Sequence, residues 1–164
     1  MVEWSITIDC KSIAFGLRWF KSSPTHKIDM EYPIAVKGII ENNNGEILIV
    51  KRSNTDDHKP NVWETVGGGM DIKESPQQAL AREIIEETGL SVEVKNPFNV
   101  FTFKKDTGEF KVGITFICKY LGGDVVLSSE HTDYKWIKSE EFVNFDSIPS
   151  LQEEILNYSR TSNK

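Results

Sequence analysis

The spacing of apolar residues predicts strands in the first half of the chain. Two β-branched runs, Pro33–Ile40 and Glu46–Lys51, flank the turn residues Asn42–Gly45, which tolerate left-handed backbone conformations. This arrangement predicts a β-hairpin. The second run contains the uninterrupted apolar stretch Ile47–Val50, which is typical of a central strand buried on both faces of a sheet.

A second group of strands is predicted further along the chain. Ser91–Lys95 alternates as a short strand, and Asn99–Lys104 with Phe110–Tyr120 predicts another hairpin. Val125–Leu127 follows a Gly-Gly turn and predicts one more short strand. One face of the second hairpin is expected to be apolar and to comprise Phe101, Phe103, Ile114, Phe116 and Cys118.

Two segments carry the signals of helices. Ser75 is a preferred N-cap, Pro76 occupies the first helical position, and Gln78 completes a Ser-x-x-Gln capping box. Gly89 suits the left-handed position just past a helix end, so a helix is expected between these two signals. A second helix is expected over Pro149–Tyr158, near the C-terminus.

The first helix carries an apolar arc beside an acidic arc, at about 100° per residue. The apolar arc comprises Leu80, Ala81, Ile84, Ile85 and Thr88. Glu83, Glu86 and Glu87 share the neighbouring arc at i, i+3 and i+4, which places their Cβ atoms about 5–6 Å apart. Three like charges so close are unfavourable, and Arg82 is the cation of this segment that can reach Glu86.

The acidic arc has two interpretations on the residues alone, a solvated face or a cation site. The arc borders the apolar stripe, and it follows Gly67, Gly68 and Gly69, which allow close backbone approach. Hard oxygen ligands with no Cys or His nearby suit Mg²⁺ or Mn²⁺. The residues therefore indicate a divalent-metal site that receives phosphates, and the solvated face remains the alternative.

The same stretch resembles a known family. Gly68, five residues, Glu74, seven residues and then Arg82–Leu90 (REIIEETGL) match every fixed position of the Nudix hydrolase signature. The resemblance implies an α/β fold in which a mixed sheet forms an α/β/α sandwich, over residues 31–164. It also implies hydrolysis of a pyrophosphate bond in a nucleoside diphosphate derivative.

The resemblance implies roles for the residues of the signature. Glu83, Glu86 and Glu87 are expected to bind Mg²⁺, with Mn²⁺ as an alternative, and Arg82 is expected to orient one of them. Glu74 is expected to support the metal site or its loop. Gly68 and Gly69 are expected to bring the backbone close to the substrate. Two loop positions differ from the family's commonest form, Val66 in place of Pro and Lys73 in place of Gly, and Lys73 argues against a positive-φ turn there.

Residues outside the signature also gain roles from the resemblance. Glu130, in a loop before a strand that contains Trp136, is the first candidate for the general base, and Glu86 is the second. The alternative for Glu130 is an exposed loop acid. His131, its neighbour, is expected either to orient Glu130 or to cover the loop. Arg52 is a candidate for substrate binding or a surface charge, and Trp63 is expected in the core.

Composition and charge narrow the functional classes. The net charge of −6 argues against an unspecific nucleic-acid binder, and no stable nucleic-acid partner is expected. No run reaches the roughly 20 apolar residues of a membrane span, and no signal peptide is recognised. Cys10 and Cys118 are isolated in sequence, which favours reduced thiols and a cytoplasmic protein.

Residues 1–30 lie outside the resemblance. Their strand-like alternation, followed by a Ser- and Pro-containing linker at 21–27, favours a structural extension. The alternative is a substrate-capping or dimer-forming element, because an added strand offers an edge for pairing, and a homodimer therefore remains open.

The sequence predicts the reaction more closely than the substrate. Small size and simple strand order are similar to those of Nudix nucleoside-triphosphate pyrophosphatases, so a nucleoside triphosphate or related nucleotide is expected. The alternative is a catalytically weak Nudix-like nucleotide sensor, which the retained signature glutamates argue against. An isomerase would need a catalytic Cys and added metal histidines, and a decapping enzyme would need a basic RNA path.

Overall fold

The computed structural model describes residues 33–56, 59–105 and 108–162, which lie within one compact unit, Tyr32–Lys164. The predicted extension over residues 1–30, with Cys10, lies outside the described residues, and the domain boundary stays a prediction. The elements of the described part are β1 (Ile34–Glu41), β2 (Ile47–Arg52), β3 (Trp63–Glu64), α1 (Pro76–Thr88), β4 (Ser91–Lys104), β5 (Phe110–Gly122), β6 (His131–Ile137), the 3₁₀ helix η1 (Ser139–Asn144) and α2 (Pro149–Ser162).

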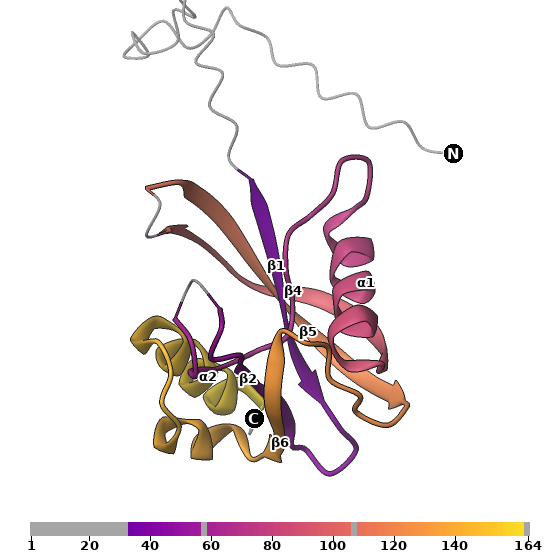
Figure 1. Ribbon diagram of the computed structural model, residues 1–164. Helices are drawn as coiled ribbons and strands as arrows, with labels where there is room; N and C mark the ends of the chain where they lie inside the picture. The colour runs from indigo at the N-terminus through magenta and orange to yellow at the C-terminus, as the bar shows by residue number, and fades with distance from the viewer. Residues whose placement is uncertain (1–32, 57–58, 106–107, 163–164) are drawn as a thin grey trace, which may run out of the picture. The chain divides into compact units, whose positions relative to one another are not determined.

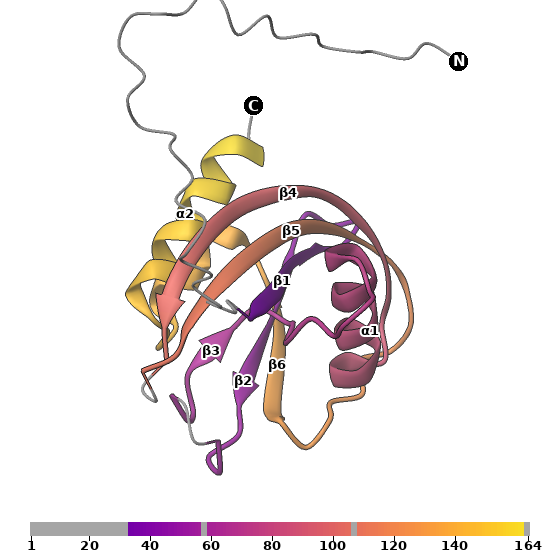
Figure 2. The ribbon, with the colours of Figure 1, turned by 90° about the horizontal axis from the view of Figure 1, so that it is seen from above.

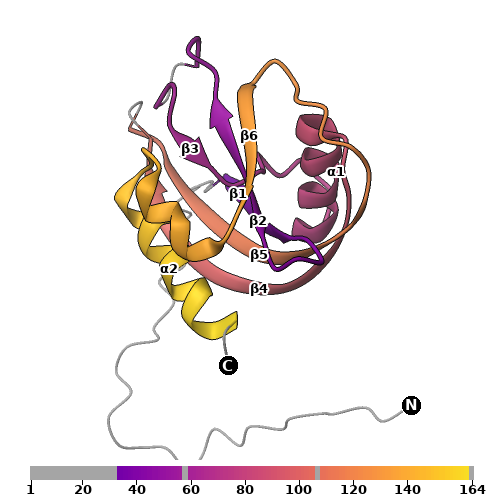
Figure 3. The same cartoon turned by 90° about the horizontal axis from the view of Figure 1, so that it is seen from below.

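The strands form one mixed sheet between two helical layers. The strand order is β3-β2-β1-β5-β4, and β6 pairs with β2. β1 and β5 are parallel, and the other strand pairs are antiparallel. Figures 1 and 2 show α1 on one side of the sheet and α2 on the other, and Figure 3 shows the same layers from below. The predicted α/β/α sandwich is therefore confirmed.

Strand β2 contributes to the core on both faces of the sheet, as its apolar run predicts. Leu48 and Val50 pack in the cluster that contains the buried side chains of α1, and Ile47 and Ile49 pack in the cluster that contains those of α2. All four side chains are almost fully buried. Because period-two alternation sends successive side chains to opposite faces, this one strand joins the two cores.

The predicted first hairpin is present at its turn but does not continue as a ladder. Asn42 and Gly45 close the turn, where Gly45 has φ 69°, yet Glu41 and Ile47 are the one register pair between β1 and β2. β1 pairs instead with β5 along its whole length. Its other edge binds the glycine loop, defined as residues 66–70, through the Gly38–Val66 and Ala35–Gly69 bridges. The loop occupies the edge that a longer hairpin would need.

Helix α1 has the predicted ends but a rotated buried face. The capping box of Ser75 and Gln78 is formed, and Gly89 follows the helix in the left-handed region with φ 70°. The prediction that Ile85 is buried is wrong, because this side chain is 58% exposed. Ala79 and Glu87 are buried instead. Glu87 is accommodated in the buried face because its carboxylate accepts a hydrogen bond from Gly67 of the glycine loop.

Two further strand predictions differ from the structure. Ser91–Lys95 and Asn99–Lys104 belong to one long strand, β4, which shifts register around Pro97. The predicted strand Val125–Leu127 is wrong, because the N–H of Val126 donates to the Thr88 carbonyl at the end of α1. The backbone of this segment is therefore bound to the end of a helix rather than to a sheet edge.

The core predictions near the site are mostly confirmed. Trp63 and Cys118 are buried, and burial raises the pKa of the Cys118 thiol to about 12. Phe116 also packs in the α1-side core. Phe101 and Phe103 are only partly buried and line a cavity beside α2 that is described below, whereas Ile114, Phe116 and Cys118 pack on the α1 side of the sheet. The prediction that these five side chains share one face is therefore wrong, because Phe101 pairs with Gly113 rather than with Ile114 across the hairpin.

Gly67→Ala is expected to destabilise the fold. A Cβ at Gly67 lies 2.2 Å from the Val36 carbonyl oxygen, and φ is 136°, so both the backbone conformation and the edge contact resist a side chain. We expect a loss of at least about 2 kcal/mol in the free energy of unfolding, measured by urea denaturation. Gly69→Ala is the matched control, since its Cβ meets nothing within 4 Å. Equal stability of the two variants would contradict the edge contact.

Candidate active site

A cavity of about 750 Å³ lies where the glycine loop, α1 and the edge of the sheet meet. Carboxylates of α1 and the loop glycines line one part of it. Cationic side chains line the same cavity, and they are Lys37, Arg52, Lys105 and Lys111. Burial and the neighbouring charge of Lys105 lower the pKa of Lys111. Opposite charges therefore surround a single space.

The glycine loop approaches α1 closely. The N–H of Gly67 donates a 3.0 Å hydrogen bond to Oε2 of Glu87. A Cβ at Gly68 lies 2.5 Å from Oε2 of Glu83, so only a glycine leaves that carboxylate in place. Gly69 lines the cavity without a close approach. Gly67 and Gly68 therefore make the close approach to α1, and the approach of Gly68 and Gly69 to a substrate stays a prediction.

Arg82 is the centre of the carboxylate cluster. Its guanidinium donates to Glu74 at 2.7 Å, to Glu83 at 2.9 Å and to Glu86 at 3.1 Å, and it also donates to the Gly69 carbonyl at 3.1 Å. The hydrogen bonds that Arg82 donates to Glu74 and Glu83 raise the pKa of its guanidinium. The expected contact with Glu86 is present, and one cation joins both ends of the signature.

Glu74 also closes the loop before α1. Its Oε1 accepts a 2.6 Å hydrogen bond from the N–H of Asp71. Between these residues Lys73 has φ 78°, so the expectation that Lys73 argues against a positive-φ turn is wrong. The Glu74 bonds to Arg82 and Asp71 hold the loop and offset the cost of that conformation, about 1–2 kcal/mol for a side chain other than glycine.

The three signature glutamates have different environments. Glu87 is 5% exposed, and burial raises the pKa of its carboxyl, while the charge of Lys37 opposes that rise. Glu83 is also mostly shielded and lines the cavity with Glu87. Glu86 is exposed, bound to Arg82 and outside the cavity lining. The acidic arc therefore directs two carboxylates inward and one outward.

The carboxylates fit a hard cation by their chemistry. Among the described residues, no three His, Cys, Asp or Glu side chains converge as a metal site. Glu83 and Glu87 nevertheless place oxygen donors in one cavity, and the buried carboxylate of Glu87 has one oxygen on Gly67 N–H. Oxygen donors and a buried negative charge suit Mg²⁺ or Mn²⁺. These donors would hold the metal that the signature implies.

Sequence reasoning missed Glu64 and Lys37. Glu64 accepts from Lys37 at 3.0 Å and from Arg52 at 2.6 Å, and Nε2 of His131 lies 3.5 Å away. Burial alone raises the pKa of Glu64, but the charges of Lys37 and Arg52 and the His131 contact outweigh it and hold the pKa well below its usual range. The available signal was a single charge within each apolar strand segment, Lys37 in Ile34–Ile40 and Glu64 beside Trp63.

Arg52 lies at the cavity rather than on the open surface. Its side chain is 20% exposed and lines the cavity, which disfavours the surface-charge interpretation. The guanidinium binds Asp56 as well as Glu64. If Arg52 binds substrate, its guanidinium does so while it also pairs with Asp56 and Glu64.

Glu130 lines the cavity from the loop before β6. The side chain is exposed, while its backbone is fixed by Ser53 N–H to the Glu130 carbonyl at 2.8 Å. His131 is buried and lies against Glu64, so the expectation that His131 orients Glu130 finds no support in its contacts. The structure places Glu130 at the same cavity as Glu83, Glu87, Arg52, Gly68 and Gly69.

Comparisons with known proteins agree with this geometry. The NUDIX domain family model matches residues 31–158. The chain is 30% identical over 127 residues to the ADP-ribose pyrophosphatase of Methanocaldococcus jannaschii, covering 77% of this chain and 70% of that protein. It is 29% identical over 115 residues to the nucleoside triphosphatase NudI of Klebsiella pneumoniae, covering 63% and 81%.

A solved structure shares the fold. The MutT protein from Methanosarcina mazei Go1 superimposes with a TM-score of 0.73 and 28% identity, covering 84% of this chain and 99% of that chain. The chain belongs to the NUDIX domain family, and the prediction of a Nudix-type pyrophosphohydrolase is confirmed at the level of the enzyme class. Among its described helices, none has the length and apolar character needed to cross a membrane.

Glu64→Gln is expected to destabilise the protein and flatten its acid sensitivity. Removing this charge leaves Lys37 and Arg52 without their shared partner, at a cost of about 3 kcal/mol near pH 7. The pKa of Glu64 is lowered on folding, so its stabilisation is present above the unfolded pKa of about 4.3 and is lost as pH falls below it.

Urea denaturation at pH 7 and at pH 3 measures this difference. The gap between the wild type and Glu64→Gln should be largest at pH 7 and smaller at pH 3. Glu140→Gln, at an exposed position of η1, is the control and should change stability by less than about 0.5 kcal/mol. A gap that widens in acid would contradict the assigned ion pairs.

Proposed function

We propose that the chain hydrolyses a pyrophosphate bond of a nucleoside triphosphate or related nucleotide in a Mg²⁺-dependent reaction, with Mn²⁺ as an alternative metal. One observation carries the proposal: carboxylates of α1, the glycine loop and four cationic side chains line the same cavity. Carboxylates suit a divalent metal, and the cations suit phosphate oxygens. A cytoplasmic location and a homodimer stay predictions.

The chemistry of the bond explains this mixture of charges. Phosphate oxygens repel a nucleophile, so a catalyst must neutralise them and hold the leaving phosphate. A divalent metal on Glu83, Glu86 and Glu87 would neutralise that charge and polarise the phosphorus centre. Lys37 and Lys111 of the same cavity would bind phosphate oxygens, and the small loop glycines would leave room for the phosphates.

The attacking water needs a proton acceptor. Glu130 is the first candidate because its exposed carboxylate lines the cavity without an ion-pair partner among the described residues. Glu86 is the second, although Arg82 binds its carboxylate at 3.1 Å. Arg82 and Glu74 act as positioning residues, since they hold Glu83 and the loop.

The substrate class rests on both the cavity and the relatives' names. Several cations in one cavity suit three consecutive phosphates better than two phosphates that carry a neutral sugar. The name of NudI supports a triphosphate, and the name of the archaeal relative makes ADP-ribose the second candidate. A panel of four ribonucleoside triphosphates and ADP-ribose, assayed with Mg²⁺ for phosphorylated products, decides between them. Faster turnover of ADP-ribose would reassign the substrate.

Glu87→Gln is expected to remove metal-dependent activity while the fold persists. The substitution keeps the shape of the side chain and its acceptor for Gly67 N–H but removes the charge. We expect kcat/KM to fall by about two orders of magnitude or more. Glu86→Gln should lower activity in the same way if Glu86 turns inward to share the metal.

Mn²⁺ binding, followed by electron paramagnetic resonance, should weaken in parallel with activity. Thermal unfolding without metal should remain close to that of the wild type. Undiminished turnover by folded Glu87→Gln would refute the metal assignment.

Glu130→Gln is expected to lower kcat by about 10²–10⁴-fold with little change in KM, as for the loss of a general base. Steady-state kinetics with the best triphosphate of the panel measures both constants. Asp133→Asn is the control, because Asp133 is exposed on β6 and lies outside the cavity lining. A change confined to KM would assign Glu130 to substrate binding.

A further inference from the structure

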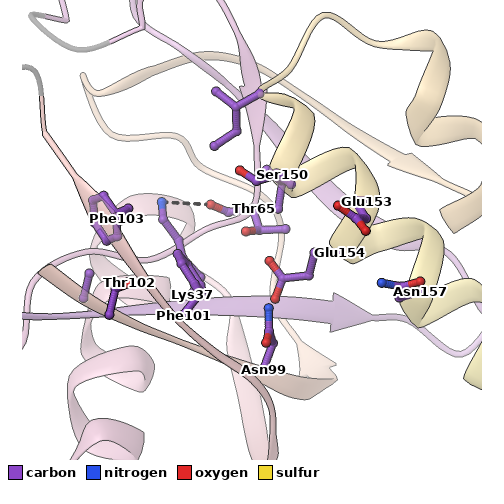
Figure 4. A pocket seen from close by; sticks show the side chains of 13 residues that line it. Lys37, Thr65, Asn99, Phe101, Thr102, Phe103, Ser150, Glu153, Glu154 and Asn157 are labelled. Carbon is purple, nitrogen blue, oxygen red and sulfur yellow. Dashed lines mark hydrogen bonds between the residues drawn. The ribbon is translucent and has the colours of Figure 1, made fainter.

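A second cavity, of about 470 Å³, lies between α2 and the sheet, and residues of β1, β4 and α2 line it. It adjoins the catalytic cavity, because Ala35, Lys37 and Phe103 line both. Figure 4 shows α2 side chains facing β4 across it. Its volume lies in the range of small-molecule sites, about 300–1,000 Å³. A ligand whose charged part occupies the catalytic cavity can therefore extend its uncharged part into this one.

One buried carboxylate faces this second cavity. Glu154 of α2 is 8% exposed, and its Oε1 has no hydrogen-bond partner among the described residues. Figure 4 shows the side chain extending from α2 toward Asn99 of β4. The hydroxyl of Thr65, also in the lining, is likewise buried without a partner in that part of the chain. Buried polar atoms of this kind are costly unless a partner meets them.

The remaining lining suits a flat, partly polar ligand. Phe101 and Phe103 of β4 supply aromatic surface, on which a base gains about 1–3 kcal/mol by stacking. Asn99 and Asn157 supply amides that both donate and accept hydrogen bonds. These side chains line the same cavity as the carboxylate of Glu154, and Asn99 lies nearest to it in Figure 4.

The carboxylate restricts the base that fits. An ionised carboxylate only accepts hydrogen bonds, and it accepts two when two donors lie side by side. The Watson–Crick edge of guanine offers that pair, N1–H and the 2-amino group, with O6 beside them for an amide donor. Adenine and cytosine place an acceptor beside their amino group. Uracil has one donor between two carbonyl oxygens, which an ionised carboxylate repels.

We propose that this second cavity binds the nucleobase of the substrate and that Glu154 selects guanine by accepting hydrogen bonds from N1–H and the 2-amino group. The inference rests on the proposed hydrolysis of nucleoside triphosphates and names the base of that substrate. A matched bidentate pair discriminates by about 1–3 kcal/mol, or roughly 5–150-fold. Leaving the buried carboxylate unpaired adds to the penalty against other bases.

Kinetics with GTP, ITP and ATP test the proposal on the wild-type protein. ITP lacks only the 2-amino group, so kcat/KM should fall about tenfold from GTP to ITP and further from ITP to ATP. Glu154→Gln keeps the shape but supplies only one acceptor. In this variant GTP should lose at least about tenfold, mainly through KM, and GTP and ITP should become similar.

The control is Glu93→Gln, which removes the same charge from β4 at an exposed position outside both cavities. It should keep the wild-type ratio of GTP to ATP. Equal turnover of GTP, ITP and ATP by the wild type would overturn the guanine assignment while the hydrolysis stands. An unchanged ratio in folded Glu154→Gln would overturn the role of Glu154.

A binding measurement separates this inference from the proposed function. Calorimetry of the wild type with GMP and AMP, without metal, does not depend on turnover. Tighter binding of GMP, weakened in Glu154→Gln, supports the nucleobase site even if no triphosphate is hydrolysed. Equal or undetectable binding of both nucleotides, together with equal turnover, refutes it.

Discussion

The glycine loop bound to the edge of β1 is the constraint on which the site depends. Hydrogen bonds from Val36 and Gly38 to the carbonyls of Gly68 and Val66 hold the loop as though it were a strand. The loop is thereby pressed against α1, where Gly67 N–H meets the carboxylate of Glu87. The shared edge explains why β1 and β2 part after their turn. It also explains why the carboxylate of Glu87 lies beside a backbone amide of the loop.

Two charged centres, the side chains of Arg82 and Glu64, each pair with several groups of opposite charge. Arg82 holds the outer carboxylates of the signature, and Glu64 holds the cations Lys37 and Arg52 at the inner wall. Each centre satisfies several opposite charges through one side chain, so neither set is left unpaired beside the apolar core. Glu83 from the first centre and Lys37, Arg52 and Glu64 from the second centre line the same cavity, so it offers carboxylates for a metal and cations for phosphates.

Structural features that depend on neighbouring residues could be predicted from the sequence. Features that depend on contacts between distant residues could not. The caps of α1 at Ser75 and Gly89, and the two-faced strand β2, follow from neighbouring residues alone. The burial of Glu87 in place of Ile85 depends on a loop that lies twenty residues earlier. Glu64 and Lys37 lie 27 residues apart, so periodicity gave no sign that they pair. The signature located the carboxylates and the sequence offered Arg52 as a candidate, but only the fold located Lys37, Lys105, Lys111 and the second cavity.

Lys37 lines both cavities, and its position fixes how they are spaced. Its ammonium group binds Glu64 and the Thr65 carbonyl, which fixes it between the space for the phosphates and the space beside α2. Because β1 pairs with β5 along its whole length, the strand sets the spacing between the two spaces. A ligand that fills both spaces presents one particular phosphorus to the carboxylates, because the span between them does not stretch. A ligand whose pyrophosphate bond lies at a different distance from its base would not place that bond beside the carboxylates. The length of the ligand would therefore decide whether it is hydrolysed.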